Sequence, residues 1–366
     1  MKHILIAAGF LAVVLAGCSG GPGTPPAAST NLGATTARRA ATAAATSLPS
    51  LGKYNVNLND IAVAGVSSGA DMATQLHFSY SANIKGEAIF AGSPFFCALG
   101  TSDAYWGLVY GPTYSADYAL YSCSGTSYWS EGESPPLSTL ETDTNNAAKD
   151  GYLDPVADLS GSKAWIFSGE DDTVVAQEVV KDSQSMLSHY GVSTTTNYTT
   201  AAEHGWVTPD TSNACGALNS QYLINCGFDA EDQILTDFFG TLNARNNGTL
   251  SGSLIEFNQS PYAVAGMDSV GYIYVPANCA SGSACKLVVA LHGCEQGEYY
   301  VGTAFVSESG LNEWADTNSI IVLYPQAIPS TGNDYGCWDW WDYTGTAYAS
   351  NEGPQVEAIW KMIQQI

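Results

Sequence analysis

Short apolar runs alternate with helix-compatible segments along most of the chain. Apolar runs that stop at Gly, Pro or polar residues lie at 62–66, 86–90, 164–167, 272–276 and 285–291. Segments of helical composition lie at 71–77, 177–190 and 355–366. Because strands that alternate with helices form parallel sheets covered on both faces, the pattern predicts an α/β fold with a single, mostly parallel sheet. At 366 residues, the chain is long enough for one large α/β domain or two smaller ones.

The amino-terminal region has the composition of a targeting segment. Lys2 precedes an apolar stretch at 4–15 that is too short to span a membrane as a stable helix. The stretch ends in Leu15-Ala16-Gly17-Cys18, which resembles a bacterial lipobox. We therefore expect a lipoprotein-type signal peptide at 1–17 and lipid attachment to Cys18. The alternative is ordinary signal cleavage with an incidental cysteine.

Residues 18–50 are mostly Gly, Pro, Ala, Thr and Ser, which cannot bury enough apolar area to fold. We expect a flexible linker there and a folded domain at 51–366. The chain carries 11 Lys and Arg against 35 Asp and Glu, so nucleic acid is excluded as a partner because phosphate binding needs clustered cations. Low charge, 21 Tyr and 9 Trp fit a secreted protein that contacts neutral, partly apolar material, although net charge also serves simple solubility.

Cysteine usage supports export. Cys18 apart, the chain has eight cysteines: Cys97, Cys123, Cys215, Cys226, Cys279, Cys285, Cys294 and Cys337. An even number in an exported chain indicates disulfides, and the absence of any Cys-x-x-Cys pair argues against a zinc site. Proximity in sequence favours Cys97–Cys123, Cys215–Cys226 and Cys279–Cys285, which leaves Cys294 and Cys337. Eight cysteines allow 105 pairings, so the connectivity stays open at this point.

The apolar run at 62–66 leads into Gly65-Val66-Ser67-Ser68-Gly69, a Gly-x-Ser-x-Gly pattern followed by a helix-compatible segment. This context is typical of a nucleophile elbow, in which a serine stands on a sharp strand-to-helix turn that excludes a Cβ at the flanking positions. The alternative is a surface Gly/Ser loop. The pattern predicts Ser67 as a nucleophile.

An acid and a base follow in the order expected for such a serine. Asp172 comes after the run at 164–167, and a carboxylate at the end of a parallel strand can orient a catalytic histidine. Glu170 and Asp171 are alternative candidates for this acid. The non-functional alternative is a solvent-exposed acidic turn without a catalytic role. His204 lies in a short polar loop further on. The order nucleophile, acid, base is that of α/β-hydrolases. Beyond His3, the other histidines are His77 and His189, which fall in helical segments, and His292.

A second apolar run at 285–291 ends in His292-Gly293-Cys294, like the His-Gly loop that supplies an oxyanion donor in esterases. We expect the backbone N–H groups of Ser68 and Cys294 to form the oxyanion hole, with His292 shaping the loop. This loop normally precedes the nucleophile in sequence, whereas here it follows the histidine. A circular permutation explains the order: 55–240 would form the nucleophile half and 250–366 the other half of one sheet and one domain.

Five motifs together resemble the poly(3-hydroxybutyrate) depolymerases, in particular the circularly permuted (type 2) catalytic domain with an α/β-hydrolase fold. They are Gly65-Val66-Ser67-Ser68-Gly69, Ser168-Gly169-Glu170-Asp171-Asp172, Glu203-His204-Gly205-Trp206, Leu291-His292-Gly293-Cys294-Glu295-Gln296 and Asn333-Asp334-Tyr335-Gly336-Cys337-Trp338-Asp339-Trp340-Trp341. The resemblance covers roughly residues 55–366. It implies that Cys294 pairs with Cys337 beside the active site and that Asn333 and Trp338 line the binding cleft. We expect at least one of Trp338, Trp340 and Trp341 to serve only as core.

The resemblance implies a serine esterase that cleaves the polyester or its oligomers through an acyl-enzyme, without metal or cofactor. A feruloyl- or acetyl-type esterase on the same fold and a non-catalytic surface-binding lipoprotein are the alternatives. The chain ends at the helical segment 355–366, so we expect no carboxyl-terminal polymer-binding module and a preference for amorphous polymer or soluble oligomers. We expect a monomer that touches membrane only through its lipid anchor, as an outer-membrane or cell-surface lipoprotein, or otherwise a periplasmic or secreted enzyme.

Overall fold

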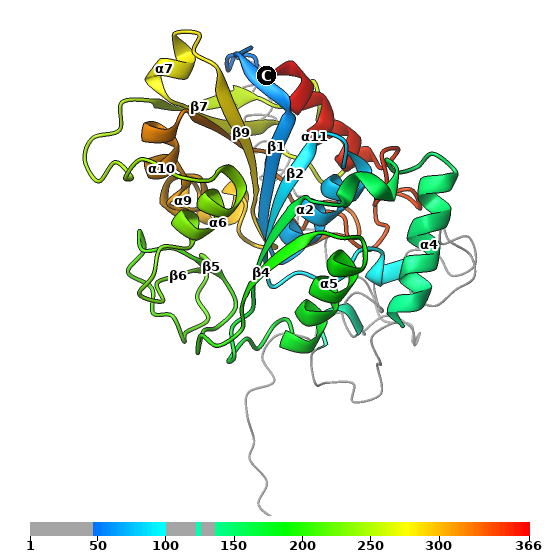
Figure 1. Ribbon diagram of the computed structural model, residues 1–366. Coiled ribbons are helices and arrows are strands. Elements are labelled where there is room, and N and C mark those ends of the chain that lie inside the picture. The colour runs from blue at the N-terminus through cyan, green and yellow to red at the C-terminus, as the bar shows by residue number, and fades with distance from the viewer. Residues whose placement is uncertain (1–46, 100–121, 126–135) are drawn as a thin grey trace, which may run out of the picture. The chain divides into compact units, whose positions relative to one another are not determined.

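A central sheet dominates the computed structural model, which describes residues 47–99, 122–125 and 136–366 (Figure 1). The expected signal peptide, Cys18 and nearly all of the expected linker lie outside these residues. The sheet has eight strands in the order β4-β3-β2-β1-β9-β10-β8-β7. Their bounds are β1 Val56–Val66, β2 Ile84–Phe90, β3 Lys163–Phe167, β4 Ser193–Asn197, β7 Ser253–Asn258, β8 Val270–Val275, β9 Cys285–Leu291 and β10 Ile320–Tyr324. A separate two-stranded sheet pairs β5 Trp206–Val207 with β6 Leu223–Ile224.

The pairing of the strands confirms the predicted α/β-hydrolase class. Strands β4, β3, β2, β1, β9 and β10 run parallel, and only the β10–β8 and β8–β7 pairs are antiparallel within this sheet. Strand β1 lies between β2 and β9, although β9 comes more than two hundred residues later in the chain. The two halves of the sequence therefore complete one sheet, as the circular permutation requires.

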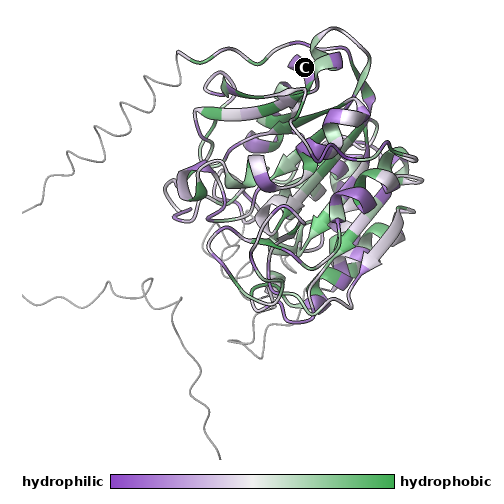
Figure 2. Cartoon of the chain, turned by 90° about the vertical axis from the view of Figure 1, so that its left-hand side faces the viewer, coloured by the Kyte–Doolittle hydropathy of each residue, from purple (hydrophilic) through white to green (hydrophobic). Residues whose placement is uncertain are grey.

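Helices cover both faces of the sheet. Successive side chains of a strand point to opposite faces, and apolar side chains on both faces of the inner strands are buried under helices. Ile61 and Val63 of β1 pack in the cluster that holds α2 (Ser68–Ser79) and α11 (Pro354–Gln365), whereas Ala62 and Ala64 pack in the cluster that holds α6 (Ala230–Phe239) and α10 (Leu311–Asn318). Figure 2 shows hydrophobic segments in the interior. The helices are α2 Ser68–Ser79, α4 Leu137–Lys149, α5 Gln177–His189, α6 Ala230–Phe239, α7 Ala277–Ala280, α8 Glu298–Val301, α9 Ala304–Glu308, α10 Leu311–Asn318 and α11 Pro354–Gln365. Of the helices in the described ranges, none is long and apolar enough to cross a membrane.

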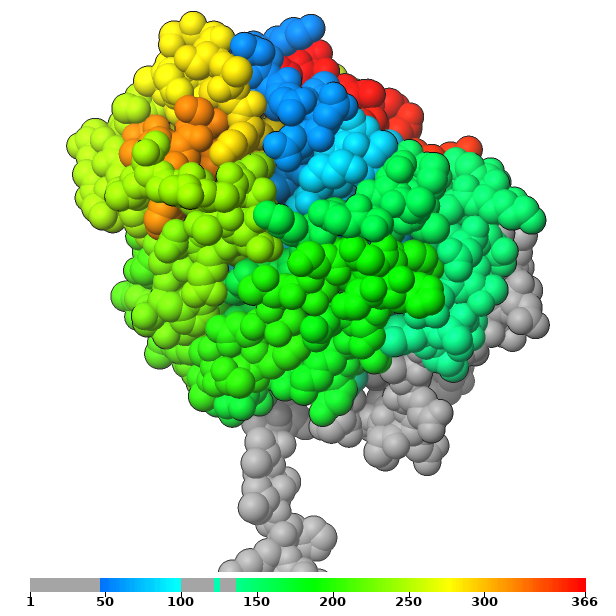
Figure 3. Space-filling model, viewed as in Figure 1, coloured from blue at the N-terminus to red at the C-terminus, as the bar shows by residue number. Residues whose placement is uncertain are grey.

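The start of the described chain is bound to its end. Tyr54 donates from its backbone N–H to the carbonyl of Ile366 over 2.5 Å. Figure 3 shows the corresponding blue and red surfaces in contact, beside the yellow segment. The carbonyl of Pro49 accepts the N–H of Asn258 at 2.8 Å. Pro49 thus already belongs to the folded part, so the linker expected to run to residue 50 ends before it.

The described residues contain four disulfides: three are the pairs that proximity in sequence favours, and the fourth is the Cys294–Cys337 pair that the family resemblance implies. Cys97–Cys123, Cys215–Cys226, Cys279–Cys285 and Cys294–Cys337 have sequence separations of 26, 11, 6 and 43. The last bridge joins the loop after β9 to the loop that carries Trp338. It therefore connects two segments that both contact the nucleophile turn.

Removing the Cys294–Cys337 bridge in a Cys294→Ser/Cys337→Ser double variant is expected to lower the free energy of unfolding by about 2–5 kcal/mol. The bridge stabilises the fold because it restricts the unfolded chain, and this effect grows with the length of the closed loop. Urea unfolding midpoints measure the effect. A Cys215→Ser/Cys226→Ser variant, with a separation of 11 against 43, is the control and should lose less. A larger loss in the control would contradict the expectation.

Candidate active site

The candidate site lies where the parallel strands of the nucleophile half end. Val66, Phe90, Phe167 and Asn197 are paired across β1, β2, β3 and β4, so these four strands end level with one another. The chain continues the pairing beyond the strands, since the N–H of Ser67 donates to the carbonyl of Phe90 at 2.8 Å. The segments that follow β1, β3 and β4 carry the predicted nucleophile, acid and base. Such an edge is where α/β sheets place their ligand sites.

Ser67 stands on a strained turn between β1 and α2. Its φ of 57° and ψ of −127° are unusual for a residue with a side chain, and such strain is held in place by its surroundings. A Cβ on Gly65 would lie 2.0 Å from the carbonyl oxygen of Gly69, and one on Gly69 would lie 2.3 Å from that of Leu291. Both positions therefore require glycine, which is the geometry expected of a nucleophile elbow. Ser67 is partly exposed, whereas its neighbours in α2 are buried.

Asp172 and His204 form a buried pair. The Nδ1 atom of His204 is 2.9 Å from Oδ2 of Asp172, and the side chains are 3% and 2% exposed. The other carboxylate oxygen of Asp172 accepts the backbone N–H groups of Val174 and Val175, each at 2.8 Å. These bonds fix the carboxylate so that it accepts the Nδ1 proton and leaves Nε2 free for proton transfer. Of the three rival acids, Asp172 is the one placed against the histidine, while Glu170 and Asp171 are exposed.

Glu203 joins the loop of the acid to the loop of the base, a role that we did not expect from the sequence. Its Oε2 accepts the backbone N–H of His204 at 2.6 Å and that of Thr173 at 3.1 Å. Its Oε1 accepts the hydroxyl of Thr173 at 2.5 Å. Glu203 is only 7% exposed, so these charge-assisted bonds are shielded from water. The only available signal was its place directly before His204.

Replacing Glu203 by alanine is expected to lower kcat by about 10- to 100-fold, because the segments that carry Asp172 and His204 lose their shared anchor. Glu203→Gln keeps an oxygen acceptor but not the charge, so it should lose less. Steady-state kinetics on a soluble ester measures both variants. Equal losses in kcat for Gln and Ala would contradict a positioning role based on hydrogen bonding, and an unchanged kcat in both would remove Glu203 from the site.

The loop after β9, in which we expect the second oxyanion donor, lies beside the nucleophile turn. Gly293 lies against the nucleophile turn, since a Cβ on it would be 3.3 Å from Cβ of Ser67. In this loop the N–H of Gly293 donates to Oε1 of Gln296 at 2.7 Å, and the N–H of Glu295 donates to the carbonyl of Tyr335 at 2.8 Å. Among the described residues, no acceptor is found for the N–H of Cys294. The N–H of Ser68 lies in the first turn of α2, where amides have no intrahelical partner.

Both ring nitrogens of His292 are hydrogen-bonded to backbone groups of neighbouring segments. Its Nδ1 donates to the carbonyl of Gly293 at 2.7 Å, and its Nε2 accepts the N–H of Ala327 at 3.0 Å. Burial lowers its pKa to about 4, against a weaker opposing effect of the bond to Gly293, so the ring is neutral at neutral pH. Both ring nitrogens are occupied, which leaves His292 no proton to exchange with substrate.

Asn333 and Trp338 are both buried, at 2% and 0% exposure. The amide of Asn333 is used within its own loop, where it donates to the carbonyl of Cys337 at 2.8 Å and accepts the N–H of Cys337 at 2.9 Å. The ring of Trp338 lies 5.4 Å from that of His292, and its backbone N–H is 3.3 Å from Oγ of Ser68. In this conformation neither side chain presents a surface to a ligand. Their contact with substrate stays a prediction, and Trp338 takes the place in the core that we expected of at least one of the three tryptophans.

Trp340 and Trp341 differ from Trp338. Both are partly exposed, their rings meet edge to face at 5.9 Å, and they pack on the Cys97–Cys123 bridge. Together with the exposed Tyr335, they are the aromatic side chains of this motif that are accessible to a ligand. No group of three or more His, Cys, Asp and Glu side chains suited to a metal ion occurs in the described part of the chain.

The amino-acid sequence is similar to a family model and to proteins of known function. The family described as "Esterase PHB depolymerase" matches residues 270–365. A "Poly(3-hydroxybutyrate) depolymerase" from Delftia acidovorans is 39% identical over 330 residues, and the match covers 88% of this chain but 62% of that protein. A "Polyhydroxybutyrate depolymerase" from Talaromyces funiculosus is 37% identical over 346 residues, with 89% of this chain and 94% of the relative covered.

A solved structure extends the match to three dimensions. It is a PHB depolymerase with a serine-to-alanine substitution, complexed with an R3HB trimer. Its TM-score is 0.74 at 35% identity, and the match covers 87% of this chain and 98% of that one. The chain thus spans less than two thirds of the Delftia relative but nearly the full length of the fungal relative and of the solved structure. On this coverage and identity, the chain belongs to the polyhydroxybutyrate depolymerase family.

Proposed function

We propose that the protein is a serine esterase that hydrolyses poly(3-hydroxybutyrate) or its oligomers through an acyl-enzyme. The observation that carries the proposal is the 2.9 Å hydrogen bond between His204 and Asp172 at the sheet edge where Ser67 stands on its strained turn. The relatives that share this domain are polyhydroxybutyrate depolymerases, and the solved structure carries an R3HB trimer. Together these support a polyester or oligoester as the substrate.

The first half of the reaction forms a covalent intermediate. The hydroxyl oxygen of Ser67 attacks the ester carbonyl carbon, and Nε2 of His204 takes the hydroxyl proton. The carbonyl oxygen becomes an oxyanion that accepts hydrogen bonds from the N–H groups of Ser68 and Cys294, each worth roughly 3 kcal/mol in the transition state. Asp172 stabilises the imidazolium. The tetrahedral intermediate then expels the leaving alkoxide, which takes the proton back from His204 and departs as the free 3-hydroxyl of the released chain.

The second half repeats these steps with water. Nε2 of His204 takes a proton from a water molecule, whose oxygen attacks the acyl carbon on Ser67. The same two amides hold the oxyanion. Collapse of the intermediate returns the proton to Oγ of Ser67 and releases the carboxylic acid. The reaction consumes one water for each ester bond broken.

Export and lipid attachment complete the proposal. Four disulfides support folding in an oxidising compartment, so we place the enzyme outside the cytoplasm. The signal peptide at 1–17 and lipidation of Cys18 rest on the sequence alone. A lipid anchor would hold the enzyme at the cell surface or outer membrane, and monomeric action is consistent with a complete site within one chain. Labelling with radioactive palmitate in the wild type but not in Cys18→Ser would test the anchor.

The substrate is tested by parallel assays on purified enzyme. Release of 3-hydroxybutyrate from amorphous polyhydroxybutyrate is measured beside release from crystalline polymer and hydrolysis of a feruloyl ester. We expect rapid release from the amorphous polymer and slower release from the crystalline one. Turnover of the feruloyl ester without release from either polymer would keep the site and discard the substrate. No turnover of any ester would favour a non-catalytic binding protein.

A further inference from the structure

Two loops have to be held at a fixed distance for the proposed reaction. The loop after β9 carries Cys294, whose N–H is the proposed oxyanion donor, and the loop after β4 carries His204. Strands β3, β2 and β1 lie between β4 and β9, so the two loops leave the sheet four strand spacings apart, which is roughly 19 Å. Hydrogen bonds between neighbouring strands therefore do not set the distance between the base and the oxyanion donor.

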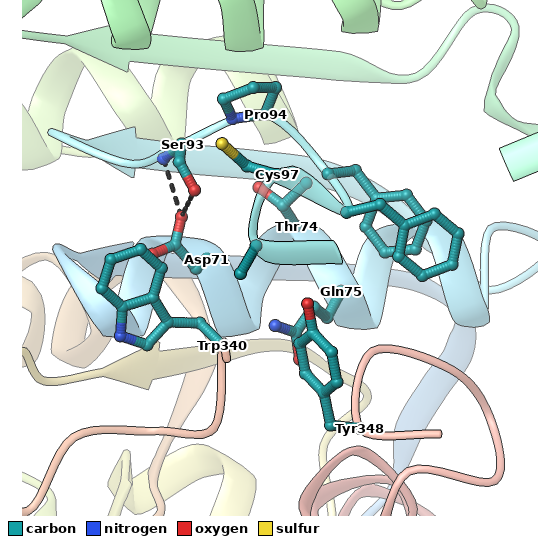
Figure 4. Close-up of a pocket in the computed structure, with 11 residues that line it drawn as sticks. Asp71, Thr74, Gln75, Ser93, Pro94, Cys97, Trp340 and Tyr348 are labelled. Atoms are coloured by element: carbon teal, nitrogen blue, oxygen red, sulfur yellow. Dashed lines mark hydrogen bonds between the residues drawn. The ribbon is translucent and has the colours of Figure 1, made fainter. Parts of the chain in front are cut away.

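The nucleophile turn is anchored separately from these two loops. Oδ1 of Asp71 in α2 accepts the backbone N–H of Ser93 at 2.7 Å and its hydroxyl at 2.8 Å (Figure 4). The backbone N–H of Asp71 donates to the carbonyl of Ser67 at 3.1 Å. These bonds tie the start of α2 to the segment after β2, and neither of the two loops takes part in them.

The segment 221–222 is packed against the histidine loop. The N–H of Trp206 donates to the carbonyl of Tyr222 at 2.8 Å, where β5 pairs with β6. A Cβ on Gly205 would lie 2.9 Å from the same carbonyl oxygen. The ring of Tyr222 meets that of His204 edge to face, with 6.1 Å between the ring centroids. This segment is thus fixed to the loop of the base.

Gln296 joins the segment 221–222 to the oxyanion loop, and its side chain is fully buried. Its Oε1 accepts the N–H of Gly293 at 2.7 Å. Its Nε2 donates to the carbonyls of Gln221 at 2.9 Å and Tyr222 at 3.1 Å. The orientation of the amide is unambiguous, because the reversed amide would place its NH₂ against an N–H and its oxygen against two carbonyls. Gln296 therefore uses its acceptor and its donors to connect two loops.

The bond to Gly293 acts on the peptide group next to the oxyanion donor. The carbonyl of Gly293 and the N–H of Cys294 belong to one planar peptide group, so they point in opposite directions. His292 donates from Nδ1 to this carbonyl at 2.7 Å, and the backbone N–H of Gln296 donates to it at 3.3 Å. The side chain of Gln296 holds the preceding peptide group. The direction of the Cys294 N–H is therefore set by Gln296 and His292 together.

Backbone strain occurs at the same contact. Tyr222 and Glu295 have φ values of 51° and 56°, in the left-handed region that residues with side chains rarely adopt. The hydroxyl of Tyr222 donates to Oε2 of Glu295 at 3.0 Å. Burial and the charge of Glu295 raise the pKa of Tyr222 above its ordinary value, so the hydroxyl keeps the proton that it donates. Such strain persists only where surrounding contacts hold it, and here it lies in both segments that Gln296 connects.

We infer that Gln296, aided by Tyr222, is a positioning residue that holds the oxyanion loop at its working distance from His204. The inference rests on the function proposed above and deepens it. In the transition state, Nε2 of His204 acts on the serine proton while the N–H of Cys294 acts on the carbonyl oxygen of the same ester. A change in their spacing therefore lowers the rate of the chemical step and leaves substrate binding nearly unchanged.

Gln296→Met tests this role, because methionine has a similar volume and makes none of the three side-chain hydrogen bonds. With nitrophenyl butyrate and with the 3-hydroxybutyrate trimer, kcat should fall about 10- to 100-fold, and KM should change less than about 3-fold. Removal of an oxyanion donor costs about 10²- to 10³-fold, and a displaced donor should cost less. Tyr222→Phe removes only a hydroxyl from a partly exposed side chain, so it should fold normally and lower kcat about 3- to 10-fold.

A transition-state analogue separates positioning from general destabilisation. The hydroxyl oxygen of Ser67 adds to the carbonyl carbon of propyl trifluoromethyl ketone, and His204 takes the proton. The oxyanion that forms accepts hydrogen bonds from the N–H groups of Ser68 and Cys294. The inhibition constant should therefore rise in Gln296→Met by the same factor, within about 3-fold, by which kcat/KM falls.

Gln259→Met is the matched control, because Gln259 is also fully buried and makes the same set of bonds. Its Oε1 accepts the N–H of Gln326 at 3.0 Å, and its Nε2 donates to the carbonyls of Asp268 at 2.8 Å and Gln326 at 2.9 Å. These bonds involve neither the loop after β9 nor the segment 221–222. Gln259→Met should lose thermal stability to a similar extent as Gln296→Met but keep kcat within about 3-fold of the wild type.

Equal losses of kcat in Gln296→Met and Gln259→Met, or a wild-type inhibition constant in Gln296→Met, would overturn the positioning role and leave the proposed function standing. If Gln296→Met does not fold, a wild-type kcat in Tyr222→Phe would overturn the role. Turnover of nitrophenyl butyrate without hydrolysis of the trimer by the wild type would overturn the proposed substrate and not the positioning role. Turnover of neither ester would overturn both.

Discussion

Replacing Ser67 by alanine is expected to lower kcat for ester hydrolysis by about 10⁴- to 10⁶-fold and to leave the fold intact. The loss is this large because no other group of the site can form the acyl-enzyme. The fold should survive because the side chain of Ser67 makes no hydrogen bond with any described residue, and alanine can occupy the same φ of 57° at similar cost to serine. Hydrolysis of a soluble ester and thermal unfolding measure the two effects.

The neighbouring serine is the matched control. In the proposed mechanism Ser68 contributes its backbone N–H, and among the described residues its hydroxyl has one hydrogen-bond partner, the N–H of Trp338 at 3.3 Å. Ser68→Ala should therefore retain activity within about 10-fold, since a single neutral hydrogen bond is worth about 1 kcal/mol. If Ser68→Ala were as inactive as Ser67→Ala, the nucleophile would be misassigned. Unfolded protein in the Ser67 variant would contradict the expectation for stability.

Replacing Asp172 by asparagine is expected to lower kcat by about 10⁴-fold at neutral pH. Asparagine can still accept the N–H groups of Val174 and Val175, so the loop should keep its shape. Its amide, however, can donate to Nδ1 of His204, which places the ring proton on Nε2 and removes the base. Steady-state kinetics across a pH series, with circular dichroism of the variant, measures the outcome.

Asp171 supplies the control for Asp172, because it has the same chemistry one residue earlier and is exposed. Asp171→Asn should change kcat by less than about 3-fold, as expected for a solvated surface carboxylate. If Asp171→Asn caused the larger loss, the histidine would be oriented by a different acid in solution. Equal small losses would show that no single carboxylate is required.

Much of the central sheet could be predicted because its inner strands are buried on both faces. The runs at 62–66, 86–90 and 285–291 lie in β1, β2 and β9. Strand β10 is also fully buried, but no strand is predicted there from the sequence. The edge strands gave no such signal. In β4 the residues Ser193–Asn197 are polar and largely solvent-accessible, and their strand conformation comes from pairing with β3. Tertiary pairing outweighs local sequence at such an edge.

The site was predictable to the extent that backbone geometry dictates residue type. The glycines around Ser67 leave a pattern in the sequence, because a Cβ would collide there. Glu203 leaves none, since its bonds to Thr173 and His204 depend on how two loops meet. The same holds for Trp338, which the family resemblance marks as a candidate ligand contact but which is buried against the ring of His292. Side-chain burial at loop contacts is a property of the whole fold and cannot be obtained from a motif.

The central claim is that Ser67 is acylated by a 3-hydroxybutyrate ester. Rapid acid quenching of the enzyme during turnover of 3-hydroxybutyrate oligomers, followed by proteolysis and mass spectrometry, tests it most directly. We predict a 3-hydroxybutyryl ester on the peptide that contains Ser67, absent in Ser67→Ala. The same adduct on another residue, or turnover by the Ser67→Ala variant at the wild-type rate, would contradict the mechanism.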